Sequence, residues 1–326
     1  MKLAFSIVNY GQTEATLRCV KSILASRQAC SLPCEVTVYL VDNFSLQANF
    51  VELQSELGAL KHVEILAQEV NLGFAAGHNR AIARILRKNS YDFVWLLNND
   101  CILEREAIDA HLKSAMSDEN IQLWGSTLLE QDGNTIQCAG GCRYWKYLSI
   151  FKSFGQGLDR SDIEHLKVPL FDYVAGASMF FRIATLKKLM TDVAETHKIA
   201  VEGQWLNETF FLYFEELDLA QRLDHKQFGW CKHAFVVHTS GLSTGVYKSG
   251  RNAISEYHST LSALKFTKLY HPHALASVGI FRFFAKSLQH IVSGDFHLIR
   301  QIFRAYRDFC RWLLESSPKR RGITDQ

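Results

Sequence analysis

Short apolar runs alternate with helical patterns over the first hundred residues of the chain. Each run has the length of a buried strand and ends in polar or glycine-containing residues. The predicted strands are Leu3–Val8, Val36–Val41, His62–Leu66 and Phe93–Leu97. The predicted helices cover Glu14–Ala25, Phe50–Leu57 and a stretch from residue 79 to about Arg87. Strands that alternate with helices predict βαβ units, and therefore an α/β fold with a mainly parallel central sheet.

Beyond this region the pattern changes. From Ile121 to Ile183 it predicts short strands joined by glycine-rich turns. An aromatic run, Phe210–Phe214, leads into an acidic helix start, and a further strand over Ala234–Val237 ends at His238. After about Ser255 the periodicity is helical. We therefore expect an α/β domain followed by a helical extension.

Composition favours a globular protein that works in the cytoplasm. The chain has 326 residues, of which 48% are hydrophobic, enough for one large core or one core with an appendage. Its first apolar run is too short for a signal peptide, because Asn9 and Gln12 interrupt it, so we interpret it as a strand. No run of about 18 uncharged apolar residues exists. The eight scattered cysteines have no zinc-ribbon spacing and are expected to be reduced structural thiols.

The most informative polar residues follow the Phe93–Leu97 run, where Asn98, Asn99 and Asp100 come in succession. Open α/β sheets bind their ligands at the carboxyl ends of strands. Magnesium and manganese prefer oxygen ligands and are often held by one or two carboxylates together with substrate phosphates. Asp100 is therefore the first metal-ligand candidate, and the alternative is an ordinary Asn/Asp turn.

Two other strand ends carry weaker signals. Asp42 could accept hydrogen bonds from a base or ribose, or could only shape an Asx turn. Gly73 and Gly77 precede a helix, where glycines allow close approach of a ligand and the helix N-terminus favours a phosphate. This segment is neither a Walker A loop nor a Gly-x-Gly-x-x-Gly loop, so alone it indicates nucleotide binding only weakly.

Three carboxylates, Glu215, Glu216 and Asp218, crowd the start of one predicted helix. The helix dipole alone could explain acids there. Their aromatic neighbours suggest a partly buried site, in which burial could adjust the pKa of a general base. His238, which follows a strand, could complete a metal shell, although a histidine in this position is more often structural.

Taken in order, these motifs resemble the inverting glycosyltransferases of family 2, which have the GT-A fold, and within it the rhamnosyltransferase-like branch. The similarity extends over roughly residues 1–270. The motifs that carry it are Val8–Tyr10, Val41–Ser45, Asn71–Asn79, Leu96–Asp100, Val174–Ser178, Phe211–Leu219 and Val237–Gly241.

The resemblance implies a GT-A-like α/β/α sandwich and a role for each motif. A nucleotide half would cover about residues 1–103 and an acceptor half about 104–270. Asp100 and His238 would hold Mg²⁺ or Mn²⁺ against the donor diphosphate, and Glu216 would be the catalytic base, with Glu215 or Asp218 as alternatives. The residues expected to bind the nucleotide sugar are Asn9, Asp42, Asn71, Gly73, Asn79, Asn98 and Asn99.

The chain departs from the family pattern at three positions. Glu216 stands where the family has Asp, and Ala81 where Gly is usual. Near Tyr257 the family often has an Arg that can face the phosphates, but here Leu261 occupies that position. Lys265 or Lys268 could take the place of this arginine. These departures bear on the identity of the donor rather than on the class of reaction.

The helical segment 271–326 is basic. Between Ile280 and Gln326 nine Lys/Arg face four Asp/Glu, although the net charge of the whole chain is only +3. Arg282, Lys286 and His290 repeat at helical spacing beside apolar residues, and so do four arginines between 300 and 311. Basic amphipathic helices of this kind suit an anionic membrane surface, and the alternative is packing on the catalytic domain or on a second subunit.

The sequence therefore predicts a metal-dependent inverting glycosyltransferase at the cytoplasmic face of the inner membrane. Its expected donor is dTDP-L-rhamnose, with a UDP-hexose as the alternative. Its acceptor would be a glycan hydroxyl, carried on a polyprenyl diphosphate, in the synthesis of a surface polysaccharide such as O-antigen. It could form a homo-oligomer.

A catalytically degenerate sugar-nucleotide-binding scaffold is the rival class. A sugar nucleotidyltransferase is disfavoured because no basic loop follows the first strand, and nucleic-acid binding because no recognised motif is present.

Overall fold

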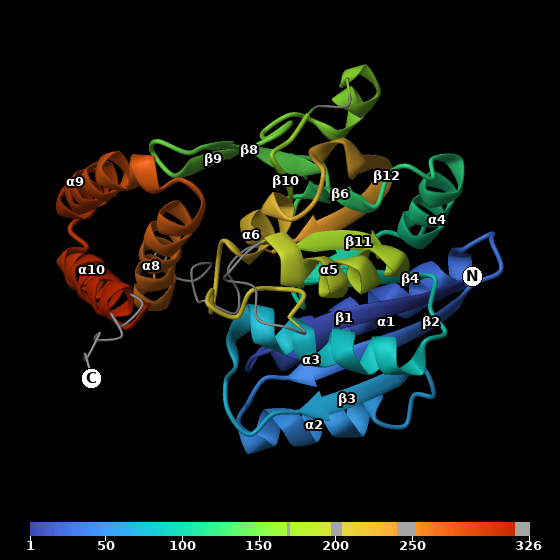
Figure 1. Cartoon of the computed structure of the whole chain (residues 1–326). Coiled ribbons are helices and arrows are strands. Elements are labelled where there is room, and N and C mark those ends of the chain that lie inside the picture. Colours follow the sequence, from blue (N-terminus) through green and yellow to red (C-terminus); the bar gives the residue numbers. More distant parts are fainter. Residues whose placement is uncertain (168–169, 197–203, 240–251, 317–326) are drawn as a thin grey trace, which may run out of the picture. The chain divides into compact units, whose positions relative to one another are not determined.

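In a computed structural model the chain divides into two compact units (Figure 1). Unit 1 holds Met1–Trp145 and Ile150–Gly250, and unit 2 holds Lys146–Ser149 and Arg251–Gln326. The structure describes residues 1–167, 170–196, 204–239 and 252–316. Residues Ser240 and Gly241 of the last motif and the basic residues at 319–321 lie outside these ranges.

A twisted sheet forms the centre of unit 1. Among the described residues nine strands take part, in the order β3-β2-β1-β4-β11-β6-β12-β5, with β7 paired to β6. They are β1 Lys2–Asn9, β2 Glu35–Asp42, β3 Val63–Ala67, β4 Phe93–Leu97, β5 Cys101–Leu103, β6 Leu123–Leu129, β7 Ile136–Ala139, β11 Ser178–Arg182 and β12 Phe228–His238. Strands β3, β2, β1 and β4 run parallel, and β11 joins β4 and β6 in antiparallel orientation. The expected α/β fold with a mostly parallel central sheet is confirmed.

Helices cover both faces of this sheet (Figure 1). Helix α1 contacts α2 and α4 on one face, whereas α3 and α5 lie on the other. Successive right-handed crossovers β1-α1-β2 and β2-α2-β3 place α1 and α2 on the same side, and the return to β4 places α3 on the opposite side. The helices are α1 Thr13–Ala29, α2 Gln47–Leu57, α3 Gly73–Lys88, α4 Ala107–Ser117, α5 Ile183–Thr196 and α6 Glu215–Gln221.

The core of unit 1 explains why β4 reads as a continuous apolar run. All five residues of Phe93–Leu97 are buried, because helices cover both faces of the sheet. The ring of Trp95 stacks on that of Phe5 with 5.1 Å between their centroids. Strand β5 was not predicted, since its three residues directly after Asp100 are too short to give a periodic signal. A smaller sheet has the order β10-β8-β9, formed by Tyr173–Val174, Gly141–Trp145 and Ile150–Ser153.

Unit 2 is helical, as the periodicity after Ser255 predicts. It contains α8 Ala253–Tyr270, α9 Leu275–Ser293 and α10 Phe296–Ser316. Its core includes Leu261, Leu264, Val278, Ala305 and Phe309. We expected the first domain to extend to about residue 270, but helix α8, with Leu261 and Lys265, belongs to unit 2. Among the described residues no helix is both long and apolar enough to span a membrane.

Candidate active site

The polar residues predicted at three strand ends come together at one edge of the sheet. Asn9 ends β1 and is paired in register with Asp42, which ends β2. The Asn9 amide donates to Asp42 Oδ1 at 2.8 Å and to Ser45 Oγ at 2.9 Å. Both side chains are buried. Asn9 therefore fixes the orientation of the Asp42 carboxylate at the carboxyl end of the sheet.

A second set of hydrogen bonds ties Asn9 to the turn after β4. The Thr16 hydroxyl donates to Asn9 Oδ1 at 2.8 Å. The Asn99 amide donates to Thr16 Oγ1 at 3.0 Å and lies 3.4 Å from Asn9 Oδ1. The side chain of Asn99 is thus buried against β1 and α1 and holds the turn, while its neighbours Asn98 and Asp100 lie on either side of it in the chain.

The glycine-containing loop before α3 is held by Asn43. Its amide donates to Asn71 Oδ1 at 2.9 Å, and its own Oδ1 accepts from Leu72 N at 2.9 Å. Asn71 Oδ1 also accepts from Gly73 N. Asn79 has other partners: its amide group exchanges hydrogen bonds with the Leu206 backbone and donates to Glu208 Oε1. The structure therefore places Asn71 and Gly73 near Asp42 and uses Asn79 to anchor the 206–208 segment.

Gly73 has a backbone conformation that only glycine adopts without strain. Its φ is +80°, and a Cβ at this position would lie 2.4 Å from the Phe211 carbonyl oxygen. The same carbonyl accepts a hydrogen bond from Phe74 N at 2.8 Å. The start of α3 therefore packs directly on the segment that leads to the acidic helix.

This contact gives a testable prediction. We expect Gly73→Ala to lower the free energy of unfolding by about 2–4 kcal/mol, because the positive φ and the contact with Phe211 both oppose a side chain. Gly157→Ala is the matched control, since Gly157 has φ +83° but open space around its Cβ position, and should cost about 1 kcal/mol. Urea unfolding measures both. Equal losses in the two variants would show that the contact with Phe211 contributes nothing.

The acidic helix α6 begins after two strained residues. Tyr213 and Phe214 have φ values of +66° and +73°, in the left-handed region that non-glycine residues rarely adopt. Two consecutive aromatic residues in this conformation must be held there by their surroundings. The resulting sharp turn starts the helix at Glu215, so that Glu215 and Glu216 project from its first turn.

The two glutamates of α6 differ in their environment. Glu215 is buried, and its Oε2 has no hydrogen-bond partner among the described residues. Desolvation, and then the charges of Glu216 and Asp218, raise its pKa well above the usual range. Glu216 is half-buried, and desolvation raises its pKa to about 7. Burial therefore favours the protonated form of Glu215, whereas the pKa of Glu216 lies near neutral pH.

Asp218 points toward structural partners. Its Oδ1 accepts from Asn207 at 2.9 Å, and its Oδ2 lies 3.1 Å from the Arg222 guanidinium. The Arg222 side chain is itself only 6% exposed. The carboxylate is thus held by an amide and a guanidinium of the protein itself. Asp218 thus fixes the end of α6.

A short segment, Gly176–Ala177, joins α6 to the turn after β4. The Cβ position of Gly176 lies 3.5 Å from Glu216 Cδ, so the glutamate side chain rests on this glycine. The carbonyl of the next residue, Ala177, accepts from Asn98 N at 3.0 Å. Gly176 thus contacts Glu216, and the adjacent Ala177 contacts the Asn98–Asp100 turn. This segment brings the two close together, although more than a hundred positions separate them in the sequence.

Asp100, Cys101 and His238 form a cluster that could hold a metal ion. Their ligand atoms lie within 4.8 Å of one another, and His238 Nε2 is 3.4 Å from Asp100 Oδ1. Strand pairing aligns the cluster, since His238 is opposite Cys101 in the β12–β5 ladder. Burial, reinforced by the charge of Asp100, raises the pKa of the Cys101 thiol well above its usual range, and the thiol donates to Ala177 O. The hard donors are therefore Asp100 and His238.

Gln137 sets the orientation of the His238 ring. Its Oε1 lies 2.7 Å from His238 Nδ1, and its amide reaches Glu130 Oε2 at 3.2 Å. Because the Gln137 oxygen can only accept, Nδ1 donates this hydrogen bond, and the ring is held with Nε2 on the side of Asp100. This is how proteins commonly hold a metal-binding histidine.

The donor set fits a divalent cation. Asp100 Oδ1 and Asn98 Oδ1 are buried, and neither accepts a hydrogen bond within the part of the chain that the structure describes. Buried oxygens without a donor are costly unless a cation or water satisfies them. One carboxylate, one amide oxygen and one imidazole leave coordination positions for phosphate oxygens and water.

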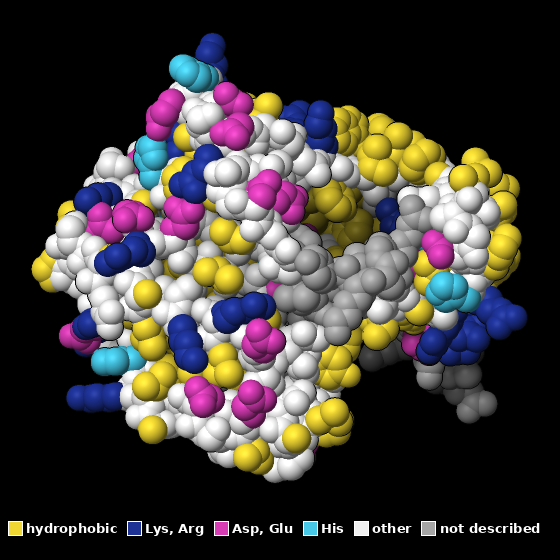
Figure 2. Space-filling model, turned by 180° about the vertical axis from the view of Figure 1, so that it is seen from behind, with side chains coloured by type: hydrophobic (Ala, Val, Ile, Leu, Met, Phe, Trp, Pro, Cys, Tyr) yellow, Lys and Arg dark blue, Asp and Glu magenta, His cyan; other side chains and the backbone are white. Residues whose placement is uncertain are grey.

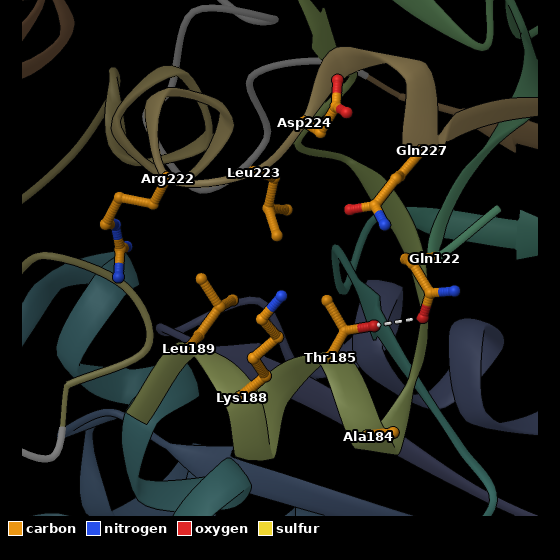
Figure 3. A pocket seen from close by; sticks show the side chains of 9 residues that line it. All are labelled: Gln122, Ala184, Thr185, Lys188, Leu189, Arg222, Leu223, Asp224 and Gln227. Atoms are coloured by element: carbon orange, nitrogen blue, oxygen red, sulfur yellow. Dashed lines mark hydrogen bonds between the residues drawn. The ribbon is translucent and has the colours of Figure 1, made fainter. Parts of the chain in front are cut away.

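A separate pocket of about 360 Å³ lies between α5 and the turn after α6 (Figure 3). Leu189 and Lys188 point into it from α5, and Leu223 from the opposite wall. Thr185 Oγ1 donates to Gln122 Oε1 at 2.9 Å along its rim. The residues that line it include none of the predicted site residues. Arg222, which lines this pocket, also forms the ion pair with Asp218.

Several residues of the site carry no signal in the sequence. Thr16, Asn43 and Gln137 each organise one predicted residue through hydrogen bonds, but isolated polar residues inside ordinary elements cannot be distinguished from surface positions by pattern. Cys101 was treated only as a structural thiol. The glycine at 176 belongs to a motif already quoted, and the structure adds its contact with Glu216.

Comparison with known proteins agrees with this arrangement. Residues 5–162 match the family model of glycosyl transferase family 2. No curated protein matches the chain. S. aureus TarS 1–349 in complex with UDP-GlcNAc is 14% identical, covers 95% of this chain and 80% of that chain, and has a TM-score of 0.50. GalNAc-T7 with UDP, GalNAc and Mn²⁺ is 13% identical, covers 97% of this chain and 57% of that chain, and has a TM-score of 0.51.

At this identity the two structures establish the fold alone, and both are GT-A glycosyltransferases. The family match includes Asn9, Asp42, Asn71 and Asp100, whereas Glu216 and His238 lie beyond it. The expected GT-A fold is confirmed, and so is the family 2 resemblance over this segment; the rhamnosyltransferase-like branch stays a prediction. Residues 5–162 therefore match the model of glycosyl transferase family 2, in a chain with the GT-A fold.

Proposed function

We propose that the protein is a metal-dependent inverting glycosyltransferase in which Glu216 is the catalytic base. The observation that carries this proposal is the convergence of Glu216, Asp100 and Asp42 on one edge of a GT-A sheet, connected through Gly176–Ala177 and Asn9. Transfer of a sugar from a sugar nucleotide needs three functions: recognition of the nucleoside, neutralisation of the charge on the diphosphate and deprotonation of the acceptor.

The choice of base follows from the two glutamates. A general base must be ionised yet basic enough to take a proton near the operating pH. Burial raises the pKa of Glu215 well above its usual range and so opposes its ionisation, whereas Glu216, with a pKa of about 7, meets both conditions. Glu216 takes the proton from an acceptor hydroxyl while that oxygen attacks the anomeric carbon of the donor, and the bond to the diphosphate breaks. One displacement inverts the anomeric centre.

Asp100 and His238 would hold Mg²⁺ or Mn²⁺ beside the diphosphate. The cation, when bound, would neutralise charge on the departing nucleoside diphosphate. Asp42, held by Asn9, would accept hydrogen bonds from the base, and Asn71 with Gly73 would line the nucleotide pocket.

The pKa of Glu216 predicts a pH dependence. Because the base acts only when deprotonated, kcat/KM should rise with pH from about 6 and level off above about 8. The expected profile has an apparent pKa near 7, the value to which burial raises Glu216. A pH–rate profile under conditions of metal saturation measures it. A profile with its rise near pH 4.5 would assign the base to a carboxylate that burial does not affect.

We propose dTDP-L-rhamnose as the donor, on the basis of the sequence motifs. A UDP-hexose is the second candidate, favoured by the UDP-GlcNAc and the UDP found in the two structures of similar fold. A thermal-shift panel of dTDP-rhamnose, UDP-glucose, UDP-galactose, UDP-GlcNAc and GDP-mannose, with and without Mn²⁺, tests the choice. The true donor at 100 times its dissociation constant should stabilise the fold by about 2.7 kcal/mol.

We also propose that the acceptor is a glycan on a polyprenyl diphosphate, used in the synthesis of a bacterial surface polysaccharide. The enzyme would then work at the cytoplasmic face of the inner membrane. The exposed arginines of α10 in unit 2 support this placement, since an anionic surface attracts them.

A further inference from the structure

Helix α9 is built with its charged side facing inward. Arg282 donates to Ser149 O and Ser259 O, both at 2.9 Å, and is 7% exposed. Lys286 Nζ lies 2.7 Å from Glu256 Oε1, and His290 Nε2 lies 3.1 Å from Glu256 Oε2. Glu256 belongs to α8 and is also buried. The sequence predicted a basic amphipathic helix; the structure turns its basic side toward α8.

The opposite side of α9 is apolar and exposed. Phe284 is 66% exposed, Leu288 62% and Val292 80%, and these residues follow one another at a spacing of four. Ile280, Phe281 and Ile291 flank them and are exposed as well. Within Leu275–Ser293, all of which the structure describes, the only Lys, Arg, Asp or Glu residues are Arg282 and Lys286, and both face inward. We call the six exposed apolar residues the α9 outer face: Ile280, Phe281, Phe284, Leu288, Ile291 and Val292.

The orientation of α9 is specified by its polar contacts. Rotation of the helix to bury the α9 outer face would leave the buried Glu256 carboxylate without Lys286 and His290. An unpaired buried charge is far more costly than an exposed apolar side chain. An apolar stripe held outward in this way is typical of a surface that another apolar phase covers.

The neighbouring helix, α10, indicates what kind of apolar phase covers the α9 outer face. Phe303 of α10 is 57% exposed, and its ring lies 5.2 Å from that of Phe283, so the apolar surface continues onto α10. Along the outer side of α10 come exposed arginines, of which Arg304, Arg307 and Arg311 share the single carboxylate of Asp308. Arg300 is exposed on the same side. Figure 2 shows hydrophobic side chains of the helical unit beside dark blue Lys and Arg side chains.

A second copy that met this surface with its own α10 would bring the same arginines, three of which already share their Asp308. An anionic bilayer instead supplies both an apolar layer and negative phosphates. We propose that the α9 outer face inserts into the interfacial layer of an anionic membrane, while Arg300, Arg304, Arg307 and Arg311 contact lipid phosphates. This inference deepens the proposed function, on which its choice of a membrane rests, by naming the element that enters the lipid.

Flotation with lipid vesicles tests the proposal on the full chain. Wild-type protein should float with vesicles of 70% phosphatidylcholine and 30% phosphatidylglycerol. The double variant Phe284→Glu/Leu288→Glu should bind at least 50-fold more weakly, because two charges replace two inserted side chains. The matched control is Val51→Glu/Met116→Glu, which adds the same charges at two exposed apolar positions of unit 1 and should float like wild type. Arg300→Ala/Arg307→Ala should weaken binding about fivefold per arginine.

Unchanged flotation of Phe284→Glu/Leu288→Glu, with a wild-type circular dichroism spectrum, would overturn the proposal. So would a dimer in solution that this variant converts to a monomer, because a second copy would then cover the α9 outer face. The donor thermal shift is measured without vesicles. A donor shift without flotation would therefore reject the membrane face alone, and flotation without any donor shift would reject the proposed function alone.

Discussion

Replacement of Glu216 by Gln should reduce sugar transfer by about 100- to 10,000-fold while the protein stays folded and binds its donor. The loss has this size because a positioned general base contributes that factor to the rate. Gln keeps the shape of the side chain that rests on Gly176 but cannot take a proton. The measurement is the initial rate of nucleoside diphosphate release in the presence of acceptor.

Two variants make this result specific. Glu215→Gln should lose less than about tenfold, because burial favours the neutral form of Glu215, which Gln resembles. Glu119→Gln, at an exposed position, should change nothing. If Glu215→Gln were as inactive as Glu216→Gln, the assignment of the base would be wrong.

The stability of Glu216→Gln provides an independent check. The pKa of Glu216 is raised in the folded state, so the folded protein binds this proton more tightly than the unfolded chain does. Ionisation therefore costs stability as pH rises from about 4.5 to about 7, and the cost persists at higher pH. The Gln variant avoids it and should unfold at a temperature equal to or above that of wild type at pH 8.

Replacement of Asp100 by Asn should remove metal-dependent activity, with a loss of about 100-fold or more at a metal concentration that saturates wild type. Asp100 supplies the one carboxylate of the cluster, so its loss removes the charge that attracts a divalent cation. Manganese binding, followed by isothermal titration calorimetry with the nucleoside diphosphate present, should weaken in parallel.

Gln137, which orients His238, should affect metal binding less strongly than Asp100 does. Gln137→Leu should weaken metal binding by about 10- to 100-fold, since partners that orient a ligand typically contribute that factor. Asp132→Asn, in an exposed turn, is the matched control for the change of charge. Full activity of Asp100→Asn without added metal would contradict the proposed metal site.

The sequence allowed much of this account to be predicted, because two physical signals were strong. Buried parallel strands give continuous apolar runs, as at Phe93–Leu97, and the polar residues after such strands must gather at one edge of the sheet. Asp42 and Asp100 were expected at that edge on this basis, whereas Asn9 was expected to bind the donor only from the resemblance to the family. The position of α6 was evident from its aromatic and acidic residues.

Other features depend on contacts that no local pattern reveals. The difference between Glu215 and Glu216 arises from burial, which adjacent positions of one helix turn do not disclose. The role of Gln137 comes from the pairing of β7 with β6, far from His238 in the chain. The orientation of α9 is decided by Glu256 on another helix, so the amphipathic pattern was visible but the side that faces outward was not.

The measurement that tests the central claim most directly is nucleoside diphosphate release from each sugar nucleotide of the panel, with a membrane lipid extract as the source of acceptor. The account predicts release from one donor, with Mn²⁺ or Mg²⁺ required, abolished by EDTA and absent in Glu216→Gln. A folded protein that binds a donor in the thermal-shift panel but releases no diphosphate, with or without extract, would contradict the account and identify a sugar-nucleotide-binding scaffold instead.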